Sequence, residues 1–152
     1  MGVQLGTRFV MSEECNAHPN FKEVFIRAKA RDAMATPQFD SRLPVIPVRA
    51  LKNVGTNDFA KLQLDLLKKL DDGEMDRTEA QYEVERFWMG ALRRAVVDGD
   101  IENGSLMAGQ SVGLVDKVMP LADIIDELLT DAESTLKEMR DMLGACETED
   151  RP

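Results

Sequence analysis

Residues 2–11 read GVQLGTRFVM and follow Met1 directly, and this stretch decides which fold the rest of the chain joins. Its β-branched and apolar residues over 3–11 predict a short buried strand. A lone strand cannot satisfy its own backbone N–H and C=O groups without neighbouring strands. We therefore expect either a helical domain with one β arm or the end of a larger α/β fold, and the second is more economical.

Gly6 and Thr7 stand where this predicted strand ends. A glycine lets a ligand or another backbone approach closely, and the N–H and hydroxyl that follow can donate to a phosphate oxygen. In (β/α)8 barrels the usual phosphate site is built by the loops after strands 7 and 8. A Gly-Thr pair also fits an ordinary turn, so the pair alone is a weak signal.

The remainder of the chain is expected to be mainly helical. Pro19 fits a first helical position with His18 as the cap residue, and apolar spacing extends that helix to about Arg31. Prolines 37, 44 and 47 exclude a long helix between 32 and 53. Three further apolar stripes predict helices that end at Gly73, at Gly99 (after a cap at position 76 or 78) and at Gly144.

Residues 106–115 form a different kind of segment, apolar or small nearly all round, which predicts a buried helix. Gly109 and Gly113 in it suggest close approach of another backbone or a ligand. These expectations divide the chain into a strand with its helix (1–33), an extended crossover (34–56), a helical region (57–144) and a disordered tail (145–152). The last helix, from Pro120 to about Leu143, either packs on its own domain or offers a face to a partner.

Composition narrows the function classes. The chain has 152 residues, a net charge of −9 and a pI near 4.7, and nucleic-acid binding needs a basic face, so nucleic acid is not an expected partner. No apolar run approaches the ~20 residues that span a bilayer, and no signal peptide is visible. We expect a cytoplasmic protein that does not enter membranes.

The sequence predicts no metal site and no catalytic residue. His18 is the one histidine and is explained as a helix cap. Residues 98–104, DGDIENG, alternate acids like a calcium loop, but Asn103 and Gly109 stand where such a loop needs its glycine and its bidentate glutamate.

Three segments in register carry a resemblance to a known family. They are GVQLGTRFVMSEECNAHPNFKEVFIRA (2–28), PVRALKN (47–53) and GALRRAVVDGDIENGSLMAGQSVGLV (90–115). Together they resemble the FMN-dependent nitronate monooxygenases (formerly 2-nitropropane dioxygenases) and the related FMN-type enoyl-acyl-carrier-protein reductases. The resemblance runs from Gly2 to about Leu129, and the NGS-MAGQ-GLV and AHPN-K strings are nearer to the enoyl reductase branch.

The resemblance implies a fold and a cofactor. The fold is a TIM-type barrel with an added helical portion, in which the strand ending in Gly-Thr is the eighth and holds the FMN phosphate. The cofactor-binding positions that match are Gln4, Leu5, Gly6 and Thr7, with Met107, Gly109 and Gln110 near the flavin. The family's catalytic histidine lies on a part that this chain does not match, and His18 is not at its position.

The length suggests a fragment. A (β/α)8 barrel usually needs about 250 residues, so strands one to seven would be absent and the chain would be the C-terminal portion of the flavoprotein. The intact oxidoreductase would use NAD(P)H with an acyl-carrier-protein thioester, as in fatty acid biosynthesis, or oxidise an alkyl nitronate. The sequence leaves the choice open, and we expect the chain alone to be inactive.

Two alternatives remain. The chain could be a stand-alone helical interaction module whose apolar stripes are covered by self-association or by a partner. It could also be one half of a split flavoenzyme, completed by a second chain that supplies the missing strands. A homo-oligomer or a complementing chain is therefore an expected partner.

Overall fold

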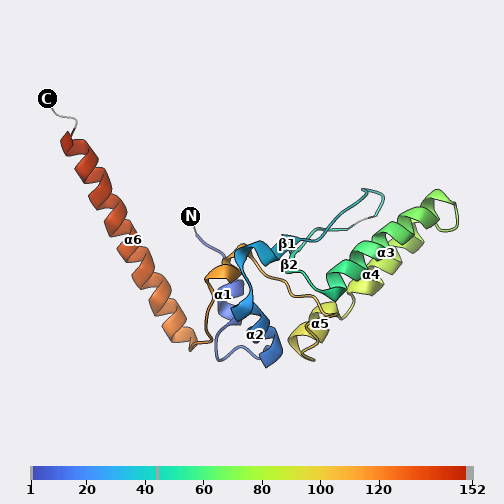
Figure 1. Ribbon diagram of the computed structural model, residues 1–152, viewed down its shortest axis with the longest axis horizontal. Coiled ribbons are helices and arrows are strands. Elements are labelled where there is room, and N and C mark those ends of the chain that lie inside the picture. Colours follow the sequence, from blue (N-terminus) through green and yellow to red (C-terminus); the bar gives the residue numbers. More distant parts are fainter. Residues whose placement is uncertain (1, 44, 150–152) are drawn as a thin grey trace.

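The chain forms ten helices, 3-10 turns and strands in a computed structural model that describes residues 2–43 and 45–149. They are α1 (Thr7–Val10), α2 (Pro19–Arg27), the 3-10 turn η1 (Ala30–Asp32), β1 (Ala33–Ala35), β2 (Arg49–Leu51), α3 (Val54–Asp71), α4 (Arg77–Trp88), α5 (Ala91–Val96), the 3-10 turn η2 (Gln110–Leu114) and α6 (Leu121–Glu149). Figure 1 shows a central part with α1, α2 and the two strands, the α3–α4 hairpin on one side and α6 projecting on the other.

The strand expected over residues 3–11 is wrong. Residues 2–6 have no regular structure, with Val3 87% exposed, and residues 7–10 form α1. The Val10 N–H donates to the Gly6 carbonyl at 3.2 Å, so the backbone satisfies itself locally. A strand needs a neighbouring ladder, and within the described residues this stretch joins no sheet: its one backbone bond to a distant segment is from the Met119 N–H to the Met11 carbonyl at 3.2 Å.

The helix start expected at Pro19 is confirmed. The His18 Nδ1 accepts a hydrogen bond from the Asn20 N–H at 3.1 Å, and α2 ends at Arg27, four residues earlier than expected. Phe21 and Phe25 on its inner face are buried with ring centroids 4.5 Å apart. Lys22 is also buried, and its Nζ donates to the Ser12 carbonyl at 2.6 Å.

Two short strands form the centre. β1 and β2 pair antiparallel, and residues 106–108 run beside β2, where the Leu51 N–H donates to the Leu106 carbonyl at 2.9 Å. The buried helix expected over 106–115 is therefore wrong. Leu106 and Ala108 are buried while Met107 between them is exposed, which is the alternation of an extended chain.

Gly113 has the close approach expected of it. It lies in η2 against η1, and a Cβ at this position would come within 2.6 Å of the Ala30 backbone nitrogen. A side chain here would therefore force the two turns apart.

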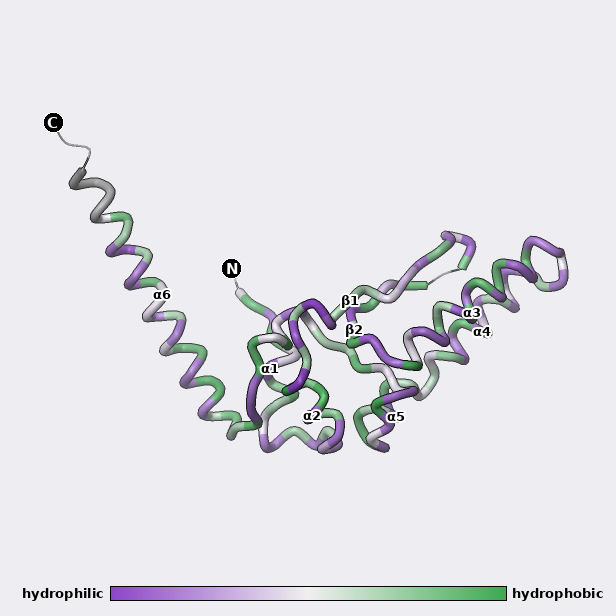
Figure 2. The backbone as a smooth tube through the Cα atoms, viewed as in Figure 1, coloured by the Kyte–Doolittle hydropathy of each residue, from purple (hydrophilic) through white to green (hydrophobic). Residues whose placement is uncertain are grey.

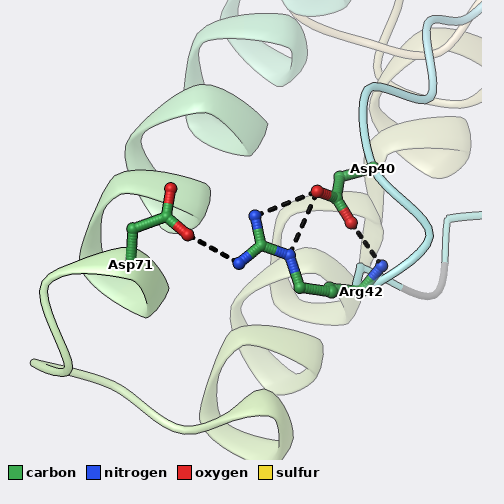
Figure 3. A network of polar contacts seen from close by, with 3 residues as sticks. All are labelled: Asp40, Arg42 and Asp71. Carbon is green, nitrogen blue, oxygen red and sulfur yellow. Dashed lines mark hydrogen bonds and ion pairs between the residues drawn. The ribbon is translucent and has the colours of Figure 1, made fainter.

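An arm, described over residues 36–43 and 45–48, leaves the strand pair and runs along α3. The buried Gln63 amide donates to the Pro37 carbonyl at 2.9 Å. Farther out, the Arg42 guanidinium donates to Asp40 and, at 2.6 Å, to Asp71 at the end of α3 (Figure 3). These bonds hold the pKa of Asp40 below its ordinary value. Pro44 lies outside the described residues.

The next helices begin at side-chain caps. Asn53 caps α3, and Asp76 caps α4 by accepting from the Thr78 and Glu79 N–H groups at 2.7 and 2.9 Å. The single helix expected up to Gly99 is wrong, because Gly90 adopts a positive φ of 75° that separates α4 from α5.

Helix α6 runs on to Glu149, so the end expected at Gly144 is wrong. Residues 145–149 of the expected disordered tail are helical, and residues 150–152 lie outside the described part. Figure 2 shows hydrophobic and hydrophilic residues alternating along the coloured part of α6.

Two apolar clusters form the core. The central cluster joins α1–α2, the strands and η2, and its largest buried members are Met11, Phe21, Phe25, Leu106 and Val112. The hairpin cluster lies between the arm, α3 and α4, and consists of Leu43, Val45, Phe59, Leu66, Ala80 and Val84. Phe87 and Trp88 pack against Phe59, with Trp88 at a centroid distance of 4.6 Å.

Candidate functional site

A hollow of about 500 Å³ lies between the N-terminal segment, the η2 turn and the start of α6. We call it the Thr7 hollow. Three segments form its walls. The lining residues are 4–8, then Gly109, Ser111, Leu114 and Val115, and then Glu127, Leu128 and Asp131 of α6. Segments more than 100 residues apart in the sequence therefore meet at one place.

A hydrogen bond joins two of the sequence-predicted positions across this hollow. The Gly109 N–H donates to the Thr7 Oγ1 at 2.9 Å. A Cβ on Gly109 would lie 3.4 Å from the same oxygen, which is an ordinary van der Waals contact, so the bond does not itself require glycine. Because Thr7 accepts in this bond, its own O–H proton remains available to a ligand.

Five of the seven predicted cofactor-binding residues line the hollow. They are Gln4, Leu5, Gly6, Thr7 and Gly109. Gln110 is exposed beside it, and Met107 lies in a separate apolar depression with Ile46, Trp88 and Leu92. Met107 is directed elsewhere because residues 106–108 are extended, so neighbouring side chains face opposite ways.

The backbone around Gly6 carries free donors. Among the residues that the structure describes, none accepts a hydrogen bond from the N–H groups of Gly6, Thr7 or Arg8. A Cβ at Gly6 would meet nothing within 4 Å, so the space beside it is open. Such a run of unpaired N–H groups suits an anion more than a cation.

Charged side chains that the sequence did not single out complete the hollow. The Arg8 guanidinium, whose side chain is only 12% exposed, donates to Glu127 at 2.7 Å and also contacts the Met119 sulfur. Its Nη1 is buried without a partner in the described part of the chain. Asp131 lies one turn beyond Glu127, so the wall holds two carboxylates and one cation.

The acidic loop at 98–104 is explained by its own hydrogen bonds. The Asp100 carboxylate accepts from the Asn103 backbone N–H at 2.9 Å, from the Asn103 amide and from the Glu102 N–H. These bonds hold the pKa of Asp100 below its ordinary value. Over residues 2–43 and 45–144, no three His, Cys, Asp or Glu side chains lie together as metal ligands.

One further finding concerns α3 and α6, the longest helices in the described part. Neither they nor any shorter described helix combines the length and the apolar character needed to cross a membrane.

Comparison with known proteins finds one family model and two solved structures that are similar to this chain. The family model described as nitronate monooxygenase matches residues 1–131. The solved structure of FabK from Thermotoga maritima is similar with 32% sequence identity and a TM-score of 0.71, covering 91% of this chain and 39% of that one. Its M276A mutant gives 30% identity and a TM-score of 0.61, covering 90% and 35%. No curated protein matches by sequence.

Proposed function

This chain belongs to the nitronate monooxygenase family, and we propose that it supplies part of the FMN-phosphate site of an FMN-dependent oxidoreductase. The observation that carries the proposal is the Thr7–Gly109 hydrogen bond, which holds two positions implied by the family resemblance at one hollow. FMN would supply the hydride or electron transfer, and the chain's part is to bind and orient it.

Thr7 and Gly6 would hold the phosphate. The Thr7 hydroxyl has a proton left to donate, and the N–H groups of residues 6–8 have no acceptor within the described residues. Gly6 leaves open space on the same side. Gln4, Leu5 and Gly109 would form the adjoining wall, while Met107 and Gln110 would reach the flavin only after a change in the 106–110 segment.

The carboxylates of α6 act against an anion in the hollow. Arg8 is neutralised by Glu127, so Asp131 adds an uncompensated negative charge at the wall. A phosphate would therefore bind more tightly if Asp131 were neutral.

The chain spans about 39% of the length of the FabK structure that it resembles, and no described residue of it is assigned a catalytic role. We propose that the intact enzyme is a (β/α)8 barrel in which residues 2–6 form the last strand. Its substrate would be an enoyl thioester on an acyl carrier protein, with NAD(P)H as reductant, or an alkyl nitronate. Pure chain should then show no enoyl reduction and no nitronate oxidation, and turnover would contradict this.

The binding proposal is tested by titrating FMN into the folded chain while flavin fluorescence is followed. Thr7→Val removes the hydroxyl and should weaken binding about 10-fold or more, because a hydrogen bond to a charged group is lost. Thr7→Ser keeps the hydroxyl and is the matched control. Asp131→Asn should strengthen binding several-fold by removing a like charge.

Two results would contradict the proposal. One is equal FMN affinity of the wild-type, Thr7→Val and Thr7→Ser proteins. The other is a chain that is folded by circular dichroism and binds no FMN at millimolar concentration, either alone or with a second chain that supplies the missing barrel strands.

One observation favours the second candidate, an interaction module. The chain exposes 10539 Å² of surface, whereas a compact monomer of its 17.0 kDa mass exposes about 7,700 Å². Such an open shape is also expected of one half of a split flavoenzyme. FMN binding that appears only when a second chain supplies the missing barrel strands would favour the split enzyme over the module.

A further inference from the structure

One face of helix α6 packs against the rest of the chain at its start, and the other face does not. Ile124 is buried, and Glu127 pairs with Arg8 of α1. Beyond Leu128 every described side chain of α6 is exposed, including Leu136 at 67%. Figure 1 shows this part of the helix projecting away from all other elements.

The unused face has the seven-residue repeat of a coiled coil. Apolar residues follow one another at intervals of four, three, four, three and four positions. They are Ile125, Leu129, Ala132, Leu136, Met139 and Leu143. In heptad terms Leu129, Leu136 and Leu143 are a positions, and Ile125, Ala132 and Met139 are d positions, which is the pattern of helices that pair lengthwise.

We propose that two copies of this chain pair through α6 in antiparallel orientation. The orientation follows from how the side-chain sizes fit along the seam, by which we mean the row of these six apolar residues. Antiparallel pairing sets a positions against d positions, so Ile125 meets Leu143 and Leu129 meets Met139 of the second copy. The small Ala132 then meets Leu136, whereas parallel pairing would set Ala132 against itself and leave a gap.

The charges beside the seam favour the same orientation. The e positions are Asp126, Glu133 and Arg140, and in an antiparallel pair e faces e. Asp126 of each copy then faces Arg140 of the other, which gives two ion pairs. In a parallel pair Arg140 would face Thr135 and Glu133 would face Leu128, so no ion pair would form.

One contact opposes the pairing. Glu133 faces Glu133 of the second copy near the centre, and these like charges repel. The seam is therefore short and carries an internal penalty, so the dimer should dissociate in the micromolar range. None of the six paired apolar residues lines the Thr7 hollow, although the neighbouring Leu128 does, and the pairing does not rest on the proposed FMN site.

Sedimentation equilibrium of the full chain across the micromolar range tests the pairing. We expect a monomer–dimer equilibrium that Leu136→Glu abolishes, since it puts a charge in the seam. Ser134→Glu adds the same charge on the outer face of α6 and should leave the dimer unchanged. Both side chains are exposed, so the monomer should stay folded, which circular dichroism checks.

A charge exchange tests the orientation. Arg140→Asp should weaken the dimer about three- to ten-fold, because two ion pairs become like-charge contacts. Adding Asp126→Arg should restore the affinity, and Glu133→Gln should increase it. The proposal would be overturned by a monomeric wild-type chain, by equal effects of Leu136→Glu and Ser134→Glu, or by failure of the charge exchange to restore the affinity. A monomer would indicate that the rest of the barrel covers this face of α6.

Discussion

The central cluster and the hairpin cluster are built in different ways. The central cluster draws residues from Met11 to Val115 and joins short elements whose own hydrogen bonds are few. The hairpin cluster joins two consecutive helices to Leu43 and Val45 of the arm. Local contacts of that kind form faster and with less chain entropy lost than contacts between distant segments.

The difference matters for function because the Thr7 hollow rests on the central cluster. Val115 belongs to both, and Gly109 follows the buried Ala108. No residue that lines the Thr7 hollow belongs to the hairpin cluster. The candidate site therefore depends on the part of the chain with the longest-range contacts, and we expect the helical hairpin to unfold separately from it.

The largest expected effects come from emptying each cluster in turn. Phe25→Ala and Phe59→Ala each remove a fully buried ring and should lower the free energy of unfolding by about 3–5 kcal/mol. The single Trp88 packs on Phe59, so its fluorescence reports the hairpin cluster. In urea, Phe59→Ala should shift the Trp88 transition strongly, and Phe25→Ala should shift mainly the circular dichroism transition.

Phe39→Ala is the control for this pair. Phe39 is 47% exposed on the arm, so its loss should leave both transitions nearly in place. If Phe25→Ala moves the Trp88 transition as far as Phe59→Ala does, the two clusters unfold as one unit and the comparison fails.

A smaller loss of stability is expected from changing Asn53, which lies where the two clusters join. The Asn53 side chain caps α3 and also donates to the Ile101 and Gly104 carbonyls at 2.9 and 2.7 Å. Asn53→Ala should cost about 1–3 kcal/mol, since a cap is lost and two carbonyls lose their donor. It should also separate the Trp88 and circular dichroism transitions in urea.

Asn57→Ala provides the comparison for Asn53, because Asn57 is exposed on the same helix. It should change the free energy of unfolding by no more than about 0.5 kcal/mol. Two transitions that move together in Asn53→Ala would show that the clusters are coupled through more than this side chain.

The sequence predicted what local chemistry decides. His18 before Pro19 and Asp76 before α4 are caps in the structure, because a cap needs only its own first turn. The stripe on α3 and the close approach at Gly113 were also predicted. Residues 3–11 and 106–115 were predicted wrongly, since a distant partner decides whether such apolar segments are strand or helix.

The candidate site was likewise predicted only in part. The family resemblance pointed to Thr7 and Gly109, and the structure brings them together. Arg8 and Glu127 pair across 119 positions, and no periodicity or motif links two residues that far apart. The same resemblance pointed to Met107, which lies in a separate depression because residues 106–108 are extended, so its contact with the flavin stays a prediction.

The smallest expected effect is a pH dependence at the outer end of the hairpin cluster. The hydrogen bonds from Arg42 hold the pKa of Asp40 below the ordinary value of 3.8 (Figure 3). A lowered pKa in the folded chain means that this stabilisation is complete above pH 3.8 and is lost as the pH falls through the lower folded value. Arg42→Gln should remove that part of the pH dependence of the Trp88 transition, and because the groups are exposed the change should be slight. Asp71→Asn removes only the bond between Arg42 and Asp71, so the pH dependence of the Trp88 transition should remain. A flat pH response in both variants would show that the dependence comes from the Asp71 bond rather than from Asp40.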